Sequence, residues 1–300
     1  MRAGEHRPIM VAEALRCLRP APGDIAVDCT LGGGGHARAI LERIQPGGCL
    51  FGLDVDSIEL RLTETRLRGA GFGAESFVAC HGSFAELPQL LAAAGLPPAD
   101  LIVADLGVSS MQIDDPARGF SYKASGPLDM RMDPSRGEPA SQLIARLSEP
   151  ELAALLTGNA DEPHSALIAR LLKREPVTTT RELEYVLRVE LGRALPALDK
   201  GELKMSSRRT FQALRIAVND EFAALEALLQ SLPQCLAAGG RVAIQTFHSG
   251  EDRRVKHAFR DGRRAGVYAE VAATVIRSSK AETFANRRAS AAKLRWALRA

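Results

Sequence analysis

Short apolar runs alternate with amphipathic segments over the first hundred residues of the chain. Runs with the length and apolar character of buried strands occupy residues 25–30, 49–54, 76–80 and 100–105. Segments whose apolar residues recur at helical spacing lie between them, at residues 36–44, 57–68 and 84–94. Strands that alternate with helices in this way predict a doubly wound α/β fold with a parallel sheet.

The alternation stops after residue 105, where a loop rich in Gly, Asp, Pro and Ser covers residues 114–139. The helical segments expected after this loop are residues 140–156, 164–174, 180–192 and, beyond an interruption at 196–207, a long helix over 208–232. Strand character returns at residues 241–246. We therefore expect a discontinuous core domain, residues 1–113 and 207–300, with a helical domain inserted at residues 114–206.

The composition is that of an ordinary globular protein, with 46% hydrophobic and 25% charged residues. No apolar run approaches the roughly 18 to 20 residues that span a bilayer, and the first ten residues lack the apolar core of a signal peptide. The five cysteines are scattered without CxxC spacing, which indicates neither disulfides nor a zinc site. We expect a cytoplasmic protein with no membrane segment and no metal.

The net charge is only +3, but it is distributed unevenly. Residues 253–300 hold 13 lysines and arginines against 3 acidic residues, a balance of +10 that leaves −7 on the rest of the chain. Basic side chains that neutralise phosphates gain affinity from counterion release, so this segment suits a polyanion. A solvated basic face explains the charge equally well.

Four consecutive glycines, Gly32 to Gly35, stand between the first expected strand and the next helix. Glycine permits a positive φ and lets a ligand approach the backbone N–H groups at a helix N-terminus. Asp54 ends the following strand, where a carboxylate accepts hydrogen bonds from ribose hydroxyls. These features predict a nucleoside cofactor.

The loop itself leaves two cofactors open. Gly32, Gly34 and Ala37 satisfy the G-x-G-x-x-[GA] spacing of nicotinamide enzymes. Asp28 favours S-adenosylmethionine instead, because an acid at the mouth of the loop suits a cationic amino-acid end and would repel a pyrophosphate. We expect S-adenosylmethionine as the cofactor, with Asp28 among the residues that bind it.

Two further residues fall at the carboxyl ends of the expected strands, where doubly wound sheets bind their ligands. Asp105 ends the fourth strand, and we assign it to the site because a buried carboxylate without a partner is costly. Phe84 follows the third strand and either stacks on an adenine or packs in the core. From the residues alone, we expect Phe84 to pack in the core.

Sequence blocks spread nearly from end to end of the chain carry a resemblance to a known family. They are HRPIM at 6–10, DCTLGGGGH at 28–36, GLDVD at 52–56, DLGVSSMQ at 105–112, RGFS at 118–121, GPLDMRMD at 126–133, RTFQALRI at 209–216, FHS at 247–249, EDR at 251–253 and AKLR at 292–295. In these blocks the chain resembles the RsmH (MraW) family, bacterial 16S ribosomal RNA cytosine-N4 methyltransferases. A glycine loop alone would be weak evidence, whereas GPLDMRMD, RTFQALRI and FHS-x-EDR in this order are highly specific.

The resemblance implies a class I, Rossmann-like S-adenosylmethionine-dependent methyltransferase whose inserted helical domain recognises the substrate. The cofactor contacts that it implies are Gly34, Gly35, His36, Asp54, Phe84, Asp105 and Gln112. The implied substrate is a cytidine in the decoding centre of 16S rRNA, methylated on its exocyclic N4 within the 30S subunit. The sequence leaves the oligomeric state open, with a homodimer as one alternative.

The chain departs from the family pattern at three places. Gly250 stands where the family usually has Leu, Ser206-Ser207 replaces the usual Pro-Ala, and Ala291 is an extra residue. None of these falls on an implied cofactor contact, so they concern local loop geometry and details of RNA binding.

Methyl transfer to cytosine N4 requires alignment of the amine with the methyl donor and exclusion of water. Because the N4 lone pair is delocalised into the ring, hydrogen-bond acceptors facing the amine would favour its attacking form and take up its proton. Our candidates for this role are Asp105 and the loop through Ser109 and Gln112. His248 is a candidate to orient the base or carry a proton, although most isolated histidines are structural.

Other side chains are candidates for RNA contacts. Phe120 and Tyr122 follow the fourth strand and are expected to hold a base splayed out of its stack. Arg131 either contacts a phosphate or forms an Asp–Arg clasp between insertion and core, and we weigh these alternatives equally. The expected RNA face comprises Arg208, Arg209, Arg253, Arg254, Lys256, Arg287, Arg288, Lys293 and Arg295.

Three classes of protein fit the chain to different degrees: an RNA methyltransferase, a nicotinamide-dependent oxidoreductase, and a non-catalytic RNA-binding or assembly protein that retains the fold. Asp28 and the basic C-terminal segment argue against the oxidoreductase. Asp105 and Gln112 argue against the non-catalytic protein.

Overall fold

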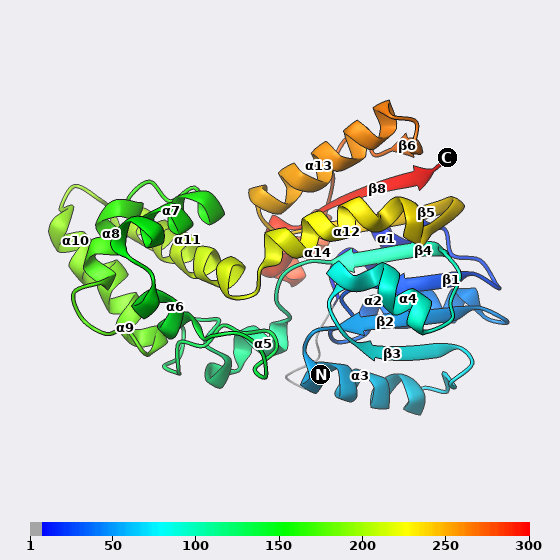
Figure 1. Cartoon of the computed structure of the whole chain (residues 1–300), viewed down its shortest axis with the longest axis horizontal. Helices are drawn as coiled ribbons and strands as arrows, with labels where there is room; N and C mark the ends of the chain where they lie inside the picture. Colours follow the sequence, from blue (N-terminus) through cyan, green and yellow to red (C-terminus); the bar gives the residue numbers. More distant parts are fainter. Residues whose placement is uncertain (1–7) are drawn as a thin grey trace. The chain divides into compact units, whose positions relative to one another are not determined.

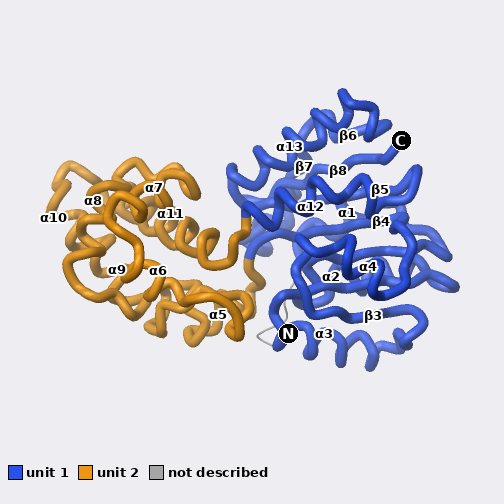
Figure 2. The backbone as a smooth tube through the Cα atoms, viewed as in Figure 1, with its two compact units in different colours: residues 1–107, 222–300 blue, residues 108–221 orange. Residues whose placement is uncertain are grey.

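The computed structural model describes residues 8–300, so His6 and Arg7 of the first sequence block lie outside the described residues. The chain divides into two compact units (Figure 2). The first, which we call the sheet unit, comprises residues up to 107 together with residues 222–300. The second, the helical unit, comprises residues 108–221.

The sheet unit is built on one eight-stranded sheet within the described residues, in the order β3-β2-β1-β4-β5-β8-β6, with β7 paired to β8 (Figure 1). The strands are β1 (Ile25–Asp28), β2 (Cys49–Asp54), β3 (Phe77–His81), β4 (Ala99–Asp105), β5 (Leu236–Thr246), β6 (Tyr268–Val271), β7 (Ile276–Arg277) and β8 (Lys293–Arg299). Strands β1 to β5 are parallel, and β8 runs antiparallel to β5. The first four strands lie within one or two residues of their expected positions, which confirms the parallel α/β architecture.

Helices cover both faces of this sheet and bury it. One face packs under α1 (Val11–Leu18), α2 (Gly35–Ile44) and α3 (Ser57–Gly69). The other packs under α4 (Leu87–Ala93), α12 (Glu221–Cys235) and α13 (Ser249–Arg264). Strands covered on both faces are apolar along their whole length rather than alternating, which is why the sequence displays them as continuous runs.

Alternation along β4 and β5 decides which side chains share a face. Leu101 and Val103 pack on the α1 side, and Ile102 and Ala104 pack on the α12 side. Because successive side chains of a strand point to opposite faces, Asp105 and its neighbour in register, Gln245, extend from the α1 side of the sheet.

The helical unit packs its own hydrophobic core, separate from those of the sheet. Its helices are α5 (Ser110–Asp114), α6 (Ala140–Arg146), α7 (Glu149–Ala160), α8 (Ser165–Leu172), α9 (Thr180–Tyr185), α10 (Leu191–Ala194) and α11 (Lys200–Val218), with a π-helical turn (Val186–Glu190) between α9 and α10 and a 3-10 turn (Pro116–Arg118) after α5. Apolar side chains of α7, α8 and α11 form the centre of this core. The expected insertion is therefore helical.

Two expectations about the later helices are wrong. The segment expected as an interruption at 196–207 lies largely inside α11, because Asp199 and Glu202 form a capping box that begins the helix at Lys200. The single helix expected over 208–232 is divided between α11 and α12 at Asp220, whose φ of 48° breaks the helical path. Consequently α11 belongs wholly to the helical unit, which ends at residue 221 rather than 206 and begins at 108 rather than 114.

A smaller difference concerns the helix expected over residues 140–156. It is divided into α6 and α7, because Leu147 is extended and Ser148 caps a new helix through Glu151. Over residues 8–300, none of the helices combines the length and the apolar character that a membrane span requires.

Candidate active site

The glycine run forms a sharp turn between β1 and α2. Gly32 has a φ of 44° and Gly34 a φ of 75°, a backbone conformation that costs other residues about 1–2 kcal/mol. A Cβ on Gly34 would lie 2.6 Å from Cγ2 of Thr63 on α3. The glycine at position 34 is therefore required both by the backbone and by the close packing of the loop on α3, and α2 begins directly after it.

Asp54 at the end of β2 holds this loop in place. Its Oδ2 accepts a hydrogen bond from the Gly32 N–H at 2.6 Å, and its Oδ1 accepts one from the Asp56 N–H at 2.8 Å. Burial raises the pKa of Asp54 above its ordinary value, although these hydrogen bonds oppose the rise. The predicted contact with a ribose stays a prediction, but the carboxylate lies directly beside the glycine turn.

Three ionisable side chains meet at the carboxyl ends of β1 and β4: Asp28, His36 and Asp105. Asp28 is 2% exposed and His36 7% exposed. Nε2 of His36 lies 3.7 Å from Oδ2 of Asp105. Oδ2 of Asp28, Nε2 of His36 and Oδ1 of Asp105 are buried and have no hydrogen-bond partner among the described residues. Buried polar atoms normally find partners, so this cluster is incomplete without a polar ligand.

The same environment perturbs the protonation of the cluster. Burial raises the pKa of Asp28 to about 6, opposed by the nearby His36 and by a 3.0 Å hydrogen bond from the Thr30 N–H. Burial lowers the pKa of His36, but the carboxylates of Asp105 and Asp28 together outweigh it and leave that pKa raised. Two carboxylates around one histidine favour a cationic ligand at this position.

Two residues of this site escaped the sequence analysis. Thr30 accepts the Asp105 N–H through Oγ1 at 2.7 Å and so ties the end of β1 to the end of β4. Gln245 lies opposite Asp105 on β5, is 1% exposed, and has neither its amide nitrogen nor its oxygen paired among the described residues. A polar residue within an apolar strand is the signal that would have identified Gln245.

Phe84 lies at the rim of the sheet unit, after β3. It begins a short 3-10 turn (Phe84–Glu86), in which Oγ of Ser83 accepts the Ala85 N–H at 3.2 Å. Its ring is half-buried and packs against the core on the α4 side. The structure therefore agrees with partial core packing of Phe84, and its contact with an adenine stays a prediction.

Ser109 and Gln112 belong to the helical unit and together begin α5. The Gln112 N–H donates to Oγ of Ser109 at 3.1 Å, and the Ser109 N–H donates to Oε1 of Gln112 at 2.9 Å. This capping box uses the Ser109 hydroxyl and the Gln112 carbonyl oxygen in local structure. Their predicted catalytic and cofactor roles stay predictions.

His248 begins α13 and is nearly buried, with its side chain 10% exposed. Its Nε2 lies 3.2 Å from Oε1 of Glu251, whose Oε2 accepts the Phe247 and His248 N–H groups. A Cβ on Gly250 would lie 2.6 Å from the Phe222 ring, and that ring lies 5.7 Å from the His248 ring. Gly250 is thus explained by the space that Phe222 occupies.

The two aromatic residues predicted to hold a base are half-buried in the helical unit. Tyr122 packs edge-on against Phe211 with ring centroids 5.4 Å apart, and Phe120 lies 5.9 Å from the Arg118 guanidinium. Both pack against the core of the unit. This packing could not be predicted from the sequence, because Phe211 is distant along the chain.

Arg131 forms the ion pair that the sequence analysis considered. Its guanidinium donates to both carboxylate oxygens of Asp129, at 2.7 and 2.8 Å. Burial raises the pKa of Asp129, but these hydrogen bonds and the charge of Arg131 outweigh it and lower the pKa. Asn219 fixes the same loop by donating to the Met130 carbonyl and accepting the Met132 N–H. Both partners lie within the helical unit, so this pair is not a clasp between insertion and core, and the phosphate contact of Arg131 stays a prediction.

The residues expected on an RNA face differ in their availability. Lys293 and Arg295 both pair with Asp252, at 3.2 and 2.7 Å, with side chains only 21% and 12% exposed. The composition of the C-terminal segment indicated the charge of these two residues but not their pairing with Asp252. Arg254 stacks on Phe222 and pairs with Glu226. The exposed residues of the set are Arg208, Arg253, Lys256 and Arg287, and Arg209 and Arg288 are half-buried.

The sheet order, the glycine turn and the acidic cluster at the carboxyl edge define the class of protein: a Rossmann-like, S-adenosylmethionine-dependent methyltransferase. The model of the MraW methylase family matches residues 3–300. The chain belongs to this family.

Named relatives agree along the whole chain. The chain is 47% identical to the ribosomal RNA small subunit methyltransferase H 2 of Alkaliphilus metalliredigens, covering 99% of this chain and 86% of the relative. It is 43% identical to ribosomal RNA small subunit methyltransferase H of Sorangium cellulosum, covering 99% and 92%. A solved putative rRNA methylase from Clostridium thermocellum aligns at 11% identity with a TM-score of 0.46, covering 99% of this chain and 100% of that one.

Proposed function

We propose that this methyltransferase transfers a methyl group from S-adenosylmethionine to 16S rRNA of the small ribosomal subunit. The relatives that share 40–47% of its residues carry the name of small-subunit rRNA methyltransferases. The more specific target, the exocyclic N4 of a cytidine in the decoding centre, follows from the family resemblance of the sequence blocks. Such a substrate would place the protein in the cytoplasm.

The observation that carries this proposal is the group of buried atoms of Asp28, His36 and Asp105 that have no hydrogen-bond partner in the described part of the chain. Residues that would hold the cofactor are those of the turn at Gly34 and Gly35, with Asp54 beside them. Asp28, an acid at the start of the turn that offers backbone N–H groups, fits a ligand with both an ammonium and a carboxylate, as the methionine end of the cofactor has. When bound, S-adenosylmethionine supplies an electrophilic methyl group.

Asp105 is the residue that we assign to the proton of the amine. Oδ1 is buried and has no hydrogen-bond partner within residues 8–300, and the Thr30 hydroxyl fixes the Asp105 backbone, so the carboxylate is held in one place with an acceptor available. A cytosine amine that donates a hydrogen bond to this oxygen would gain electron density on N4 and lose its proton to the carboxylate. His36, with its raised pKa, would keep the charge of Asp105 balanced before that transfer.

His248 supports a second, orienting role. Its Nε2 lies 3.2 Å from Oε1 of Glu251, and neither ring nitrogen has a hydrogen-bond partner within residues 8–300. A nearly buried histidine with both ring nitrogens unpaired can present one of them to the base. In the helical unit, exposed Arg208 and half-buried Arg209 on α11 are the basic residues that we propose for RNA contacts.

The experiment is single-turnover methyl transfer from radiolabelled S-adenosylmethionine to small subunits that lack the modification. We expect Asp105→Asn to lower the rate by about 100-fold or more, the range of general acid–base catalysis. The matched control is Asp100→Asn on the same strand, because an asparagine there still accepts the Ile25 N–H. Near-normal transfer by Asp105→Asn would contradict the proposed role, and a labelled nucleoside other than N4-methylcytidine would contradict the proposed target.

A further inference from the structure

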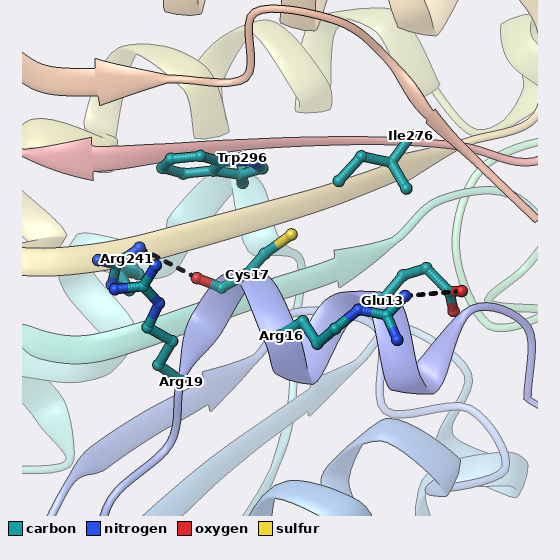
Figure 3. A pocket seen from close by; sticks show the side chains of 7 residues that line it. All are labelled: Glu13, Arg16, Cys17, Arg19, Arg241, Ile276 and Trp296. Atoms are coloured by element: carbon teal, nitrogen blue, oxygen red, sulfur yellow. Dashed lines mark hydrogen bonds and ion pairs between the residues drawn. The ribbon is translucent and has the colours of Figure 1, made fainter.

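A pocket of about 130 Å³ lies in the sheet unit, between α1 and the antiparallel strands β7 and β8 (Figure 3). The residues that line it include Glu13, Arg16, Arg19, Arg241, Ile276 and Trp296. One water needs roughly 10–15 Å³, so the pocket has room for a ligand of several heavy atoms. None of these residues belongs to the cofactor site.

One side of the pocket is aromatic and apolar. Trp296 and Ile276 lie along this side, and α1 with Cys17 lies opposite them (Figure 3). Trp296 is the only tryptophan of the chain and pairs with Ala243 in the sheet. The Arg241 guanidinium carbon lies 5.7 Å from the Trp296 ring centroid, so a cation borders the indole.

The other side is positively charged. Arg241 donates to the Cys17 carbonyl at 3.2 Å, and Arg19 ends α1 as an exposed residue. Arg16 is 68% exposed and pairs with Glu13 at 3.0 Å. Glu13 is only 15% exposed and contacts Nη2 of Arg16, so the other N–H groups of this exposed guanidinium can face a phosphate while the pair stays intact. Three arginines against one glutamate leave the pocket with a charge of +2.

We propose that this pocket binds one nucleotide of the substrate RNA, with its base on the Trp296 indole and its phosphate at Arg16 and Arg19. The inference rests on the proposed function, which supplies RNA as the polyanion. Bases stack on aromatic side chains without strong sequence preference, and arginines hold the phosphate beside them.

The position of the pocket separates it from the reaction. Arg241 precedes Gln245 by four residues on β5, which places the two residues about 13 Å apart along the strand. Gln245 lies near the carboxyl end of the strand, and Arg241 does not. The nucleotide in this pocket is therefore an anchoring contact, distinct from the base that is methylated.

The single tryptophan makes the pocket directly observable. The full-length protein is titrated with uridine 5′-monophosphate, uridine, inorganic phosphate and a single-stranded oligoribonucleotide while the Trp296 fluorescence is recorded. We expect a saturable change with the mononucleotide and the oligonucleotide, tighter for the oligonucleotide, and weaker responses to uridine and phosphate. Replacement of Arg16 and Arg19 by Gln should weaken oligonucleotide binding and reduce its salt slope, whereas Arg43→Gln on α2 should change neither.

Variants of the tryptophan test the stacking itself. By fluorescence anisotropy of a labelled oligoribonucleotide, Trp296→Leu should weaken binding about 5- to 150-fold, the equivalent of 1–3 kcal/mol per stacked base, and Trp296→Phe should retain most of the affinity. Calorimetric binding of S-adenosylmethionine checks that each variant is folded.

Equal affinity of the Leu and Phe variants for RNA, or a fluorescence response to free mononucleotide without one to RNA, would overturn the proposal. The experiments distinguish a failure of the pocket proposal from a failure of the proposed function. A saturable response to RNA without methyl transfer to small subunits would reject the function alone. Methyl transfer with unchanged fluorescence would reject the pocket alone.

Discussion

Substitution of Gly34 by alanine tests whether the turn between β1 and α2 has the geometry described. The backbone at Gly34 is left-handed, with a φ of 75°, and the added methyl group would lie 2.6 Å from Cγ2 of Thr63. Thr63 is fully buried, so its side chain has little room to move aside. Two separate penalties are therefore expected, one from the backbone and one from packing.

The magnitudes follow from these two contributions. A left-handed conformation costs a residue with a Cβ about 1–2 kcal/mol, and an extra methyl group in a packed interior costs about 1–3 kcal/mol. The sum is about 2–5 kcal/mol, which for a unit of this size lowers the melting temperature by about 2–4 °C per kcal/mol. We expect the affinity for S-adenosylmethionine to fall as well, because the loop that would hold it must shift.

Matched variants separate the two penalties in thermal unfolding. Gly95 has a φ of 67° and no atom within 4 Å of an added Cβ, so Gly95→Ala should show only the backbone penalty and leave cofactor binding unchanged. Thr63→Ser removes Cγ2 but keeps the hydroxyl that donates to the Gly32 carbonyl. In the background of Gly34→Ala it should recover about 1–3 kcal/mol of stability through the relieved clash.

Additive effects of Gly34→Ala and Thr63→Ser would contradict the close contact between these two residues. In that case Gly34→Ala and Gly95→Ala would destabilise the protein equally, and Thr63→Ser would have the same effect in the wild type as in Gly34→Ala. The loop would then lie elsewhere than on α3.

Three other predictions concern buried polar groups. The pKa of Asp28 is raised from 3.8 to about 6, so the folded state holds this proton more tightly and the associated stability is lost as pH rises from about 4 to about 6. Over that pH range the free energy of unfolding of the cofactor-free wild type should fall by up to about 3 kcal/mol more than that of Asp28→Asn, as measured by urea unfolding. If the two proteins show parallel pH profiles, the burial of Asp28 is refuted. Gln245→Leu should stabilise the cofactor-free protein by about 1–3 kcal/mol in calorimetry while slowing methyl transfer, and a loss of stability would show that the amide is paired. Asp252→Asn should destabilise the protein by about 1–3 kcal/mol at pH 7 by weakening its pairs with Lys293 and Arg295. Because these pairs hold the pKa of Asp252 below 3.8, the difference should shrink as pH falls below 3.8 and vanish only below the lowered pKa of the folded carboxyl.

The fold was largely accessible from the sequence because strands buried on both faces appear as uninterrupted apolar runs. Strand β2 coincides with its expected range, and β4 differs by one residue. The boundary of the helical unit was not accessible, because it depends on a single left-handed residue, Asp220, within an otherwise helical pattern. The capping box at Asp199 likewise extended α11 into a segment that composition marked as a loop.

The site was accessible where chemistry and strand ends coincide. Asp28 was assigned because an acid at the mouth of the glycine loop suits a cationic ligand, and Asp105 because a buried carboxylate without a partner is costly. Each has a buried oxygen with no hydrogen-bond partner within residues 8–300. Contacts between distant segments were not accessible. The pairing of Arg295 with Asp252 and the pairing in register of Gln245 with Asp105 depend on strand neighbours that no local pattern specifies.

The central claim is that this chain methylates a cytidine N4 of small-subunit rRNA, and mass spectrometry of that RNA from cells tests it most directly. The 16S rRNA is compared among cells with the gene, cells without it, and cells complemented with wild type or Asp105→Asn. We expect one N4-methylated cytidine that disappears with the gene and returns only with the wild type. An unchanged 16S rRNA in cells lacking the gene, with the lost modification found in another RNA, would contradict it.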